Sequence, residues 1–237
     1  MSSPASDDRY QALKCEYDEF TYTISHDFSA PLRHIKQFSM LLLESLDNEI
    51  SEEGRLFSEH IRRSVDRAQG MLDGLLELSR TTTNISEFTR FEVSDLVESL
   101  GHEFLTDAIE WQIKNLPWIY GDRKLLAMLF RNVIENAIKF QRKNHPLHIC
   151  ISGETAQENT CLFEIQDNGI GIVSDNPDSV FTPFFRLNAD DEYAGLGMGL
   201  TICRKIVALH GGKIWCKGQQ DQGSTVSFVL PLGQPSH

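Results

Sequence analysis

Residues 125–140 read LLAMLFRNVIENAIKF, and their spacing predicts a helix with two different faces. One face carries apolar side chains at four-residue intervals, namely Leu129, Val133 and Ala137. Asn132, Asn136 and Lys139, at positions i, i+4 and i+7, form a polar row beside them. Amide oxygens suit Mg²⁺ and a lysine offers positive charge to phosphates, so the row is a candidate phosphate and metal site. Two asparagines on an ordinary exposed helix remain the alternative.

The surrounding sequence predicts an α+β sandwich over residues 84–237. Asp122 is a suitable N-cap for a helix over residues 122–141, and Gly211 and Gly212 are suitable to end a helix over residues 200–210. Short strand-like runs occupy residues 147–151, 160–166, 213–217 and 225–230. We therefore expect a mixed sheet with helices on one of its faces.

Upstream of residue 84 the pattern is purely helical. Apolar residues recur three or four apart over residues 13–46, and a second stripe runs from Phe57 to Leu78. A polar segment separates the two stripes, and a Thr-rich stretch ends the second. We expect a helical hairpin over residues 1–83. Because a hairpin buries only part of each stripe, two copies should pair into a dimeric four-helix bundle, which makes the chain a homodimer.

Two glycine-containing segments add candidate site residues. In FEIQDNGIGI, residues 163–172, a strand ends at Asp167, and Gly169 and Gly171 then let the backbone turn and approach a flat ligand. In AGLGMGL, residues 194–200, Gly195, Gly197 and Gly199 precede a helix whose free amides favour phosphate. Each segment alone is weak evidence, but the lack of GxxxxGK[ST] argues against a P-loop enzyme.

Charge and composition narrow the class of protein. The 237 residues carry a formal net charge of -12, which argues against binding to nucleic acid or to an anionic membrane. No run reaches the roughly 18 apolar residues that cross a bilayer, so we expect no membrane contact from this segment. The five cysteines lack CxxC spacing and are odd in number, which favours reduced thiols and a cytoplasmic location.

One histidine stands out in FTYTISHDFSAPLR, residues 20–33. His26 lies two residues from both Ile24 and Phe28, roughly 200° around the helix from each, so it should face solvent. An exposed neutral imidazole is a competent nucleophile, and Asp27 could orient the ring or accept its proton. Pro31 should bend the helix nearby. An ordinary surface histidine remains the alternative.

Taken in order, six segments resemble the H, N, G1, F, G2 and G3 boxes of sensor histidine kinases of two-component systems. They are SHDFSAPLR, NVIENAIKF, QDNGIGI, FTPFFRL, GLGMGL and QGSTVSFVLPL. The resemblance covers about residues 20–232. Within that range the sequence looks most like the phytochrome-type, PAS-linked branch of the family. It implies a HisKA-type dimerisation domain followed by a GHKL-type ATP-binding domain.

The resemblance also implies an activity, ATP-dependent phosphorylation of His26 followed by transfer to an aspartate of a response-regulator receiver domain. Asp27 would be the acidic neighbour of His26. The cofactors would be ATP and Mg²⁺. By motif match, Asn136 would bind Mg²⁺, Asn132 would lie near the phosphates, and Lys139 and Arg186 would contact them. Asp167 would bind the adenine amino group, and Thr225 would line the base pocket. Gly195, Gly197 and Gly199 would form the hinge of a short mobile lid over ATP.

One residue departs from the family pattern. Ala30 stands where many relatives carry a Thr or Asn that is thought to place water for dephosphorylating the partner. Two other functions share parts of the pattern. A scaffold without turnover is disfavoured by the presence of His26, Asn136 and Asp167. An ATP-driven chaperone or repair protein of the same fold is disfavoured by the histidine-bearing hairpin and by Asn132, where such ATPases usually have a glutamate.

Overall fold

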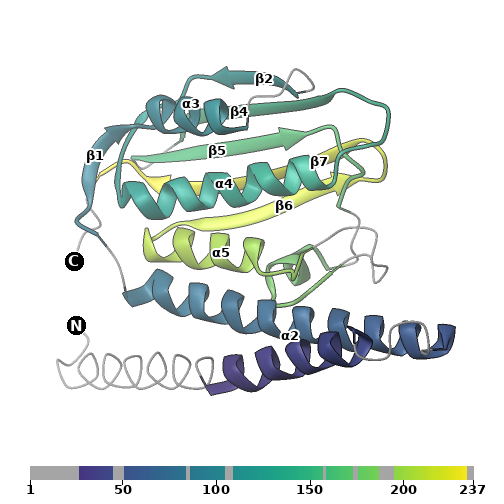
Figure 1. The fold of residues 1–237 in the computed structure, drawn as a ribbon. Coiled ribbons are helices and arrows are strands. Elements are labelled where there is room, and N and C mark those ends of the chain that lie inside the picture. Colours follow the sequence, from purple (N-terminus) through teal and green to yellow (C-terminus); the bar gives the residue numbers. More distant parts are fainter. Residues whose placement is uncertain are drawn as a thin grey trace. The chain divides into compact units, whose positions relative to one another are not determined.

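The computed structural model describes residues 27–44, 51–83, 86–104, 109–156, 159–172, 176–186 and 195–233 (Figure 1). The chain divides into two compact units, residues 1–83 and 84–237. Within the described ranges no helix is both long and apolar enough to cross a membrane. The first part of the expected N-terminal helix, including His26, lies outside the described residues.

The described part of the first unit contains two helices, residues 27–44 and α2 (Glu52–Thr83). The first helix continues through Pro31. At the start of α2, Ser51 Oγ accepts a hydrogen bond from the Gly54 N–H at 3.1 Å. The helices run antiparallel, because Lys36 Nζ lies 2.6 Å from Asp66 Oδ1 and Gln69 Nε2 lies 3.4 Å from Ser29 Oγ. The sequence prediction of a helical N-terminal region is confirmed.

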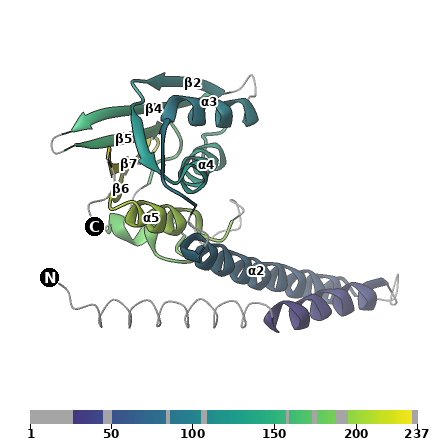
Figure 2. The ribbon, with the colours of Figure 1, turned by 90° about the vertical axis from the view of Figure 1, so that its left-hand side faces the viewer.

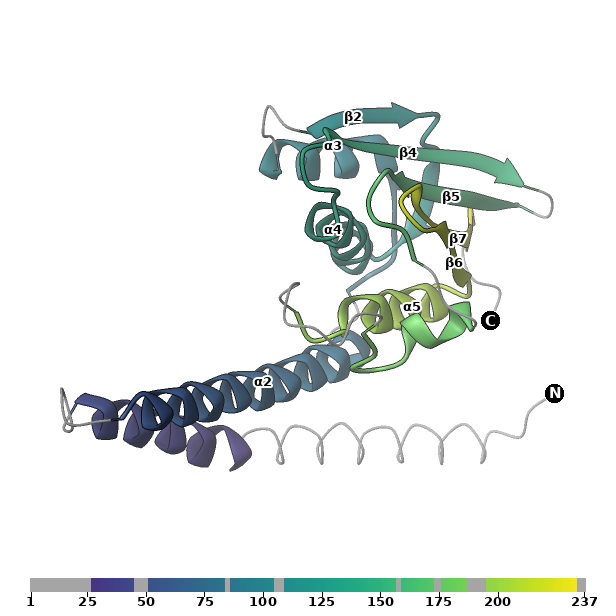
Figure 3. The ribbon, with the colours of Figure 1, turned by 90° about the vertical axis from the view of Figure 1, so that its right-hand side faces the viewer.

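The second unit is built on a five-stranded sheet in the order β2-β4-β5-β7-β6. Its strands are β2 (Ile109–Lys114), β4 (Leu147–Ala156), β5 (Thr160–Asp167), β7 (Gly223–Pro231) and β6 (Lys213–Gln219). Only β2 and β4 are parallel, and the other neighbours are antiparallel. Figures 2 and 3 show the helices of this unit on one face of the sheet. The predicted mixed sheet with helices on one face is confirmed.

The helices of this unit are α3 (Val93–Glu103), α4 (Arg123–Lys139) and α5 (Gly199–Leu209), with a short 3-10 turn, η2 (Pro177–Phe181). A separate two-stranded ribbon pairs β1 (Thr89–Glu92) with β3 (Trp118–Gly121). The helices and strands expected from sequence all occur. The elements between residues 89 and 121, together with η2, were not expected, because their short runs carry little periodicity of their own.

Stacked phenylalanines hold α4 on the sheet. Phe130 of α4 meets Phe163 of β5 and Phe228 of β7 edge-on, with ring centroids 6.1 and 5.6 Å apart. Phe163 and Phe228 stack on each other at 5.2 Å, and all three side chains are fully buried. Burying each ring stabilises the fold by roughly 1.5 to 3 kcal/mol. Because this packing fixes the rotation of α4, it also fixes where the polar row of the helix points.

The start of α4 is capped as predicted. Asp122 is fully buried, and its Oδ1 accepts hydrogen bonds from the N–H groups of Lys124 and Leu125 at 2.9 and 3.1 Å. Its Oδ2 accepts from the N–H of Ser86 at 2.6 Å. Its own N–H donates to Nε2 of His210 at 3.0 Å. The capping carboxylate therefore ties the first residues of this unit and the end of α5 to the start of α4.

Candidate active site

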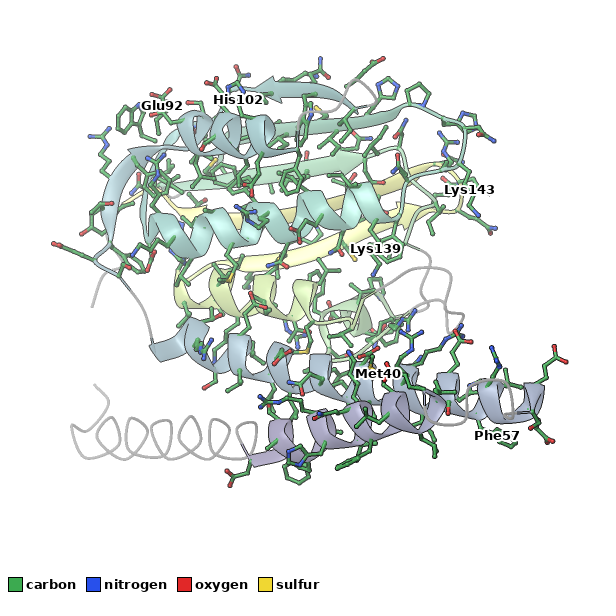
Figure 4. All side chains as sticks on the ribbon, viewed as in Figure 1. Met40, Phe57, Glu92, His102, Lys139 and Lys143 are labelled. Atoms are coloured by element: carbon green, nitrogen blue, oxygen red, sulfur yellow. The ribbon has the colours of Figure 1, made fainter. Side chains whose placement is uncertain are left out.

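The polar row of α4 is present as the sequence predicted. Asn132, Asn136 and Lys139 are all half-buried. Asn132 Nδ2 donates to the Met128 carbonyl at 3.0 Å, which leaves its Oδ1 pointing away from the helix backbone. Figure 4 shows Lys139 at the C-terminal end of α4, with Lys143 in the turn that follows.

The glycine segment, residues 195–199, runs along this row. A methyl carbon at Gly199 would lie 3.0 Å from Asn132 Oδ1, and one at Gly195 would lie 2.5 Å from Lys139 Nζ. Gly197 has a φ of 74° and its carbonyl accepts a hydrogen bond from the Phe184 N–H at 3.2 Å. The backbone thus lies against side chains of α4 at both ends of this segment. Of the sequence-predicted residues, the structure brings Gly195 to Lys139 and Gly199 to Asn132, while Gly197 lies against the backbone of Phe184 and Phe185.

Lys139 lies within the electrostatic influence of a second cation, Arg186. Burial lowers the pKa of Lys139, and the positive charge of Arg186 lowers it further. The Lys139 ammonium also lies 4.5 Å from the centre of the Phe140 ring. Two cations held together in a half-buried site repel each other unless an anion lies between or beside them. The arrangement fits a phosphate group at the C-terminal end of α4.

Asp167 lies at the end of β5, as predicted. Its Oδ1 accepts hydrogen bonds from the N–H groups of Gly169 at 2.8 Å and of Ser224 at 3.2 Å. Burial raises the pKa of this carboxyl group, and the two hydrogen bonds oppose the rise. A methyl carbon at Gly169 would lie 2.5 Å from the Phe140 carbonyl oxygen, and Gly171 has a φ of 85°. Both glycines are therefore required by the turn that follows Asp167.

The structure brings Ser224, not Thr225, to Asp167. Thr225 pairs in register with Gln166, and Val226 pairs with the buried Ile165. Because side chains alternate across a strand, Thr225 shares the open face of the sheet with Gln166. Ser224 is on the helix-covered side and contacts Asp167 through its N–H. The role that the resemblance implies for Thr225, lining the base pocket, stays a prediction.

A concave surface of about 440 Å³ lies on the open face of the sheet and borders Asp167 and Asn168 at the end of β5. The rest of its lining includes Glu110, Gln112, His148, Cys150 and Gln166. His148 Nδ1 lies 3.0 Å from Glu110 Oε2. These side chains alternate with the buried residues that face the helices, so this concavity is separate from the polar row of α4.

Comparison with known proteins identifies both units. Residues 16–84 match the His Kinase A (phospho-acceptor) domain. Residues 121–234 match the histidine kinase-, DNA gyrase B- and HSP90-like ATPase. This chain belongs to the sensor histidine kinase family. The match places His26 inside the phospho-acceptor domain, while Asp27, the described residue next to it, is exposed on the first helix.

The relatives of this sensor histidine kinase include a phytochrome-like protein and a cyanobacterial phytochrome. Phytochrome-like protein Cph1 of Synechocystis is 32% identical over 219 residues, which are 91% of this chain and 29% of Cph1. Cyanobacterial phytochrome A of Nostoc is 33% identical over 223 residues, 92% of this chain and 29% of the relative. The chain therefore spans less than a third of the length of these relatives.

The fold of the kinase also has solved counterparts. Full-length ShkA, crystallised with AMPPNP, superposes with a TM-score of 0.63 at 22% identity. The superposition covers 92% of this chain and 47% of ShkA. At this identity the likeness concerns the fold, a helical region followed by an α/β domain with a five-stranded mixed sheet.

Proposed function

We propose that this chain is an autokinase that binds ATP and Mg²⁺ in residues 84–237, phosphorylates His26, and passes the phosphoryl group to an aspartate of a response-regulator receiver domain. The observation that supports the proposal most strongly is that the glycine segment lies against the polar row of α4. Gly195 approaches the Lys139 ammonium and Gly199 approaches Asn132 Oδ1, while Arg186 adds a second positive charge.

The two ends of the nucleotide have different partners in this proposal. Lys139 and Arg186 bind the phosphates, with Asn132 close to the reacting group. Asp167 accepts a hydrogen bond from the adenine amino group, Gly169 and Ser224 hold its carboxylate, and Gly171 forms part of the turn that follows. Both backbone donors bind Oδ1 of Asp167, so Oδ2 is the oxygen that would meet the base. Gly195, Gly197 and Gly199 supply the hinge of a short lid.

The residues present fit a magnesium ion bound together with the nucleotide. Mg²⁺ prefers oxygen ligands, keeps several waters, and is usually bound by few protein groups plus phosphates. Asn136, one turn from both Asn132 and Lys139, offers one amide oxygen. In the described ranges, no cluster of three or more His, Cys, Asp or Glu could hold a metal ion. The ion would neutralise charge on the transferring phosphate.

The phosphoryl group moves in two steps. A ring nitrogen of His26 attacks the γ-phosphorus, the bond from that phosphorus to the β–γ bridging oxygen breaks, and ADP leaves. The imidazole proton passes to Asp27 or to water, which leaves a phosphoramidate with a neutral ring and an anionic phosphoryl group. In the second step a carboxylate oxygen of the partner aspartate attacks the same phosphorus. The nitrogen–phosphorus bond then breaks, and the histidine regains a proton.

We also propose that the helical unit dimerises and that the protein works in the cytoplasm. Phe28, Phe38 and Phe57 are 57%, 67% and 57% exposed in the single chain. Ile35, Leu41, Leu42, Leu56 and Ile61 are also exposed. Such a concentration of large apolar side chains on one hairpin is typical of an interaction surface. A second copy carries the same stripe, and pairing the two hairpins makes a four-helix bundle.

Incubation of the full chain with γ-labelled ATP and Mg²⁺ tests the proposal. We expect label that is acid-labile and alkali-stable, lost in His26→Gln and strongly reduced in Lys139→Met. His34→Gln is the matched control, because His34 is exposed on the same helix. Label that survives in His26→Gln, or that resists acid, would refute the assignment of His26. Nucleotide binding without any label would indicate the scaffold instead.

A further inference from the structure

Three backbone segments meet beside Asp167. They are residues 140–146 after α4, residues 167–171 after β5, and residues 219–223 between β6 and β7. The Ile170 N–H donates to the Phe140 carbonyl, and the Asp221 N–H donates to the Ile170 carbonyl, both at 2.9 Å. A methyl carbon at Gly223 would lie 1.9 Å from the Asp167 carbonyl oxygen. The segments therefore touch through their backbones, with no side chains between them.

One side chain of the first segment donates hydrogen bonds to the other two segments. Arg142 Nε donates to the Asn168 carbonyl at 2.8 Å, and Arg142 Nη1 donates to the Asp221 carbonyl at 2.9 Å. These carbonyls belong to residues 26 and 79 positions away in the chain. A guanidinium is planar, always charged and offers several donors in fixed directions, so it holds two acceptors at a defined separation.

Asn168 adds a second connection at the same place. Its Oδ1 accepts from the His148 N–H, and its Nδ2 donates to the Pro146 carbonyl, both at 2.9 Å. Residue 168 is thus held through its carbonyl by Arg142 and through its side chain by the start of β4. Its chain neighbours are Asp167 and Gly169. The position of the peptide that carries Asp167 is consequently set by these contacts.

The two donors that orient Asp167 come from segments that Arg142 joins. Gly169 N–H follows Asn168 directly, and Ser224 N–H lies three residues after Asp221. If the Asn168 and Asp221 peptides separated, the two hydrogen bonds to Asp167 Oδ1 could not both keep their length. We propose that Arg142 is a positioning residue, which aims the Asp167 carboxylate at the adenine amino group and so sets selectivity for adenine.

This inference rests on the proposed function, and in particular on the contact between Asp167 and adenine. A purely structural Arg142 would lower the thermal stability of the domain without changing which base it prefers. A positioning Arg142 would change the preference. ATP and inosine triphosphate separate the two roles, because inosine carries a carbonyl oxygen where adenine carries its amino group. A carboxylate accepts from the amino group but repels the carbonyl.

The test is calorimetric titration of ATP and of inosine triphosphate into the full chain, below the melting temperature of every variant. We expect Arg142→Met to weaken ATP binding roughly tenfold, with the ratio of ATP to inosine triphosphate affinity falling by a similar factor. Arg142→Lys, which keeps the charge but not the planar fork, should lie between it and the wild type. Lys143→Met, which removes the same charge one residue along, should leave the ratio unchanged.

Asp167→Asn in the same series distinguishes the proposed adenine contact of Asp167 from the positioning role of Arg142. If Asp167→Asn leaves the affinity ratio unchanged, the adenine contact of the proposed function is wrong. If Asp167→Asn lowers the ratio while both Arg142 variants keep the wild-type ratio, only the role of Arg142 is overturned. With both ideas correct, Arg142→Met combined with Asp167→Asn should give no lower ratio than Asp167→Asn alone.

Discussion

The two units differ in how they cover their large aromatic side chains. In residues 84–237, Phe130, Phe163 and Phe228 are fully buried against one another. In the helical unit, Phe28, Phe38 and Phe57 leave more than half of their surface in water. A sheet covered by helices completes a core within one chain, whereas two helices alone have no further layer to bury their stripes. The unit of residues 84–237 should therefore fold independently of concentration, and the helical unit should require a partner.

The largest expected effect comes from the core of the ATP-binding unit. Phe130→Ala should lower its free energy of unfolding by about 3 to 5 kcal/mol, because a cavity replaces a ring packed on two others. All three tryptophans, Trp111, Trp118 and Trp215, belong to this unit, so their fluorescence during urea denaturation measures it selectively. Ile113→Ala, at a side chain 38% exposed, is the control and should cost much less. A loss under about 1 kcal/mol for Phe130→Ala would contradict the assigned core.

The next effect should be confined to the helical unit. Phe38→Asp should weaken the proposed dimer at least roughly 100-fold, because the carboxylate would have to be buried in the interface. Light scattering on the full chain at tens of micromolar should then report a monomeric mass, while the tryptophan-detected transition stays in place. The neighbouring Gln37→Asp adds the same charge at an exposed polar position and should leave the dimer intact. A monomeric wild type would refute the dimer itself.

A smaller effect depends on pH and on one buried histidine. His210 is buried, its Nε2 accepts from the Asp122 N–H, and its Nδ1 lies 2.8 Å from the Ile206 carbonyl oxygen. Burial lowers its pKa from 6.5, although the Ile206 hydrogen bond and the Asp122 carboxylate oppose the shift. The unfolded chain therefore binds a proton below pH 6.5 that the folded unit does not bind until lower pH. Stability is complete above the unfolded pKa and is lost as pH falls toward the folded pKa.

Thermal melting between pH 7.5 and pH 5.5 checks this linkage. The tryptophan-detected melting temperature should fall on acidification. Protonation linked to His210 should lower the free energy of unfolding by up to about 1.4 kcal/mol per pH unit. His210→Gln cannot titrate, so its melting temperature should vary less over the same range. His102→Gln, at an exposed histidine of α3, is the control and should keep the wild-type profile. An equal slope in wild type and His210→Gln would show that other groups cause the pH dependence.

The smallest expected effect concerns the surface of the helical unit. Ala30 is exposed on the first helix, four residues after His26 in the sequence, and its methyl group cannot hold a water. Wild type should therefore be a poor phosphatase toward its phosphorylated partner. Ala30→Thr should accelerate dephosphorylation, by roughly tenfold if it positions the attacking water. Decay of purified phosphorylated partner, with ADP-loaded kinase, measures this. Strong acceleration by wild type with no gain from Ala30→Thr would contradict the idea.

Helical spacing and capping chemistry were readable from the sequence because both are local. The polar row Asn132, Asn136 and Lys139 lies on α4 as its spacing predicted, and Asp122 caps that helix. The ordered segments also predicted the correct family. The elements between residues 89 and 121 were missed. Their strands are short and gain stability from partners far along the chain, such as β4 for β2.

Tertiary structure decided what depends on strand register and on long-range backbone contact. A shift of one residue along β7 exchanges Ser224 for Thr225 beside Asp167, because successive side chains point to opposite faces. Arg142 stands in no recognisable motif, and its two acceptors become neighbours only when β5 and the β6–β7 turn are paired. The sequence by itself thus determined which residues form the helices and which segments carry the site. Folding decided which backbone groups meet, since a hydrogen bond needs its two atoms within about 3 Å and sequence spacing does not encode that distance.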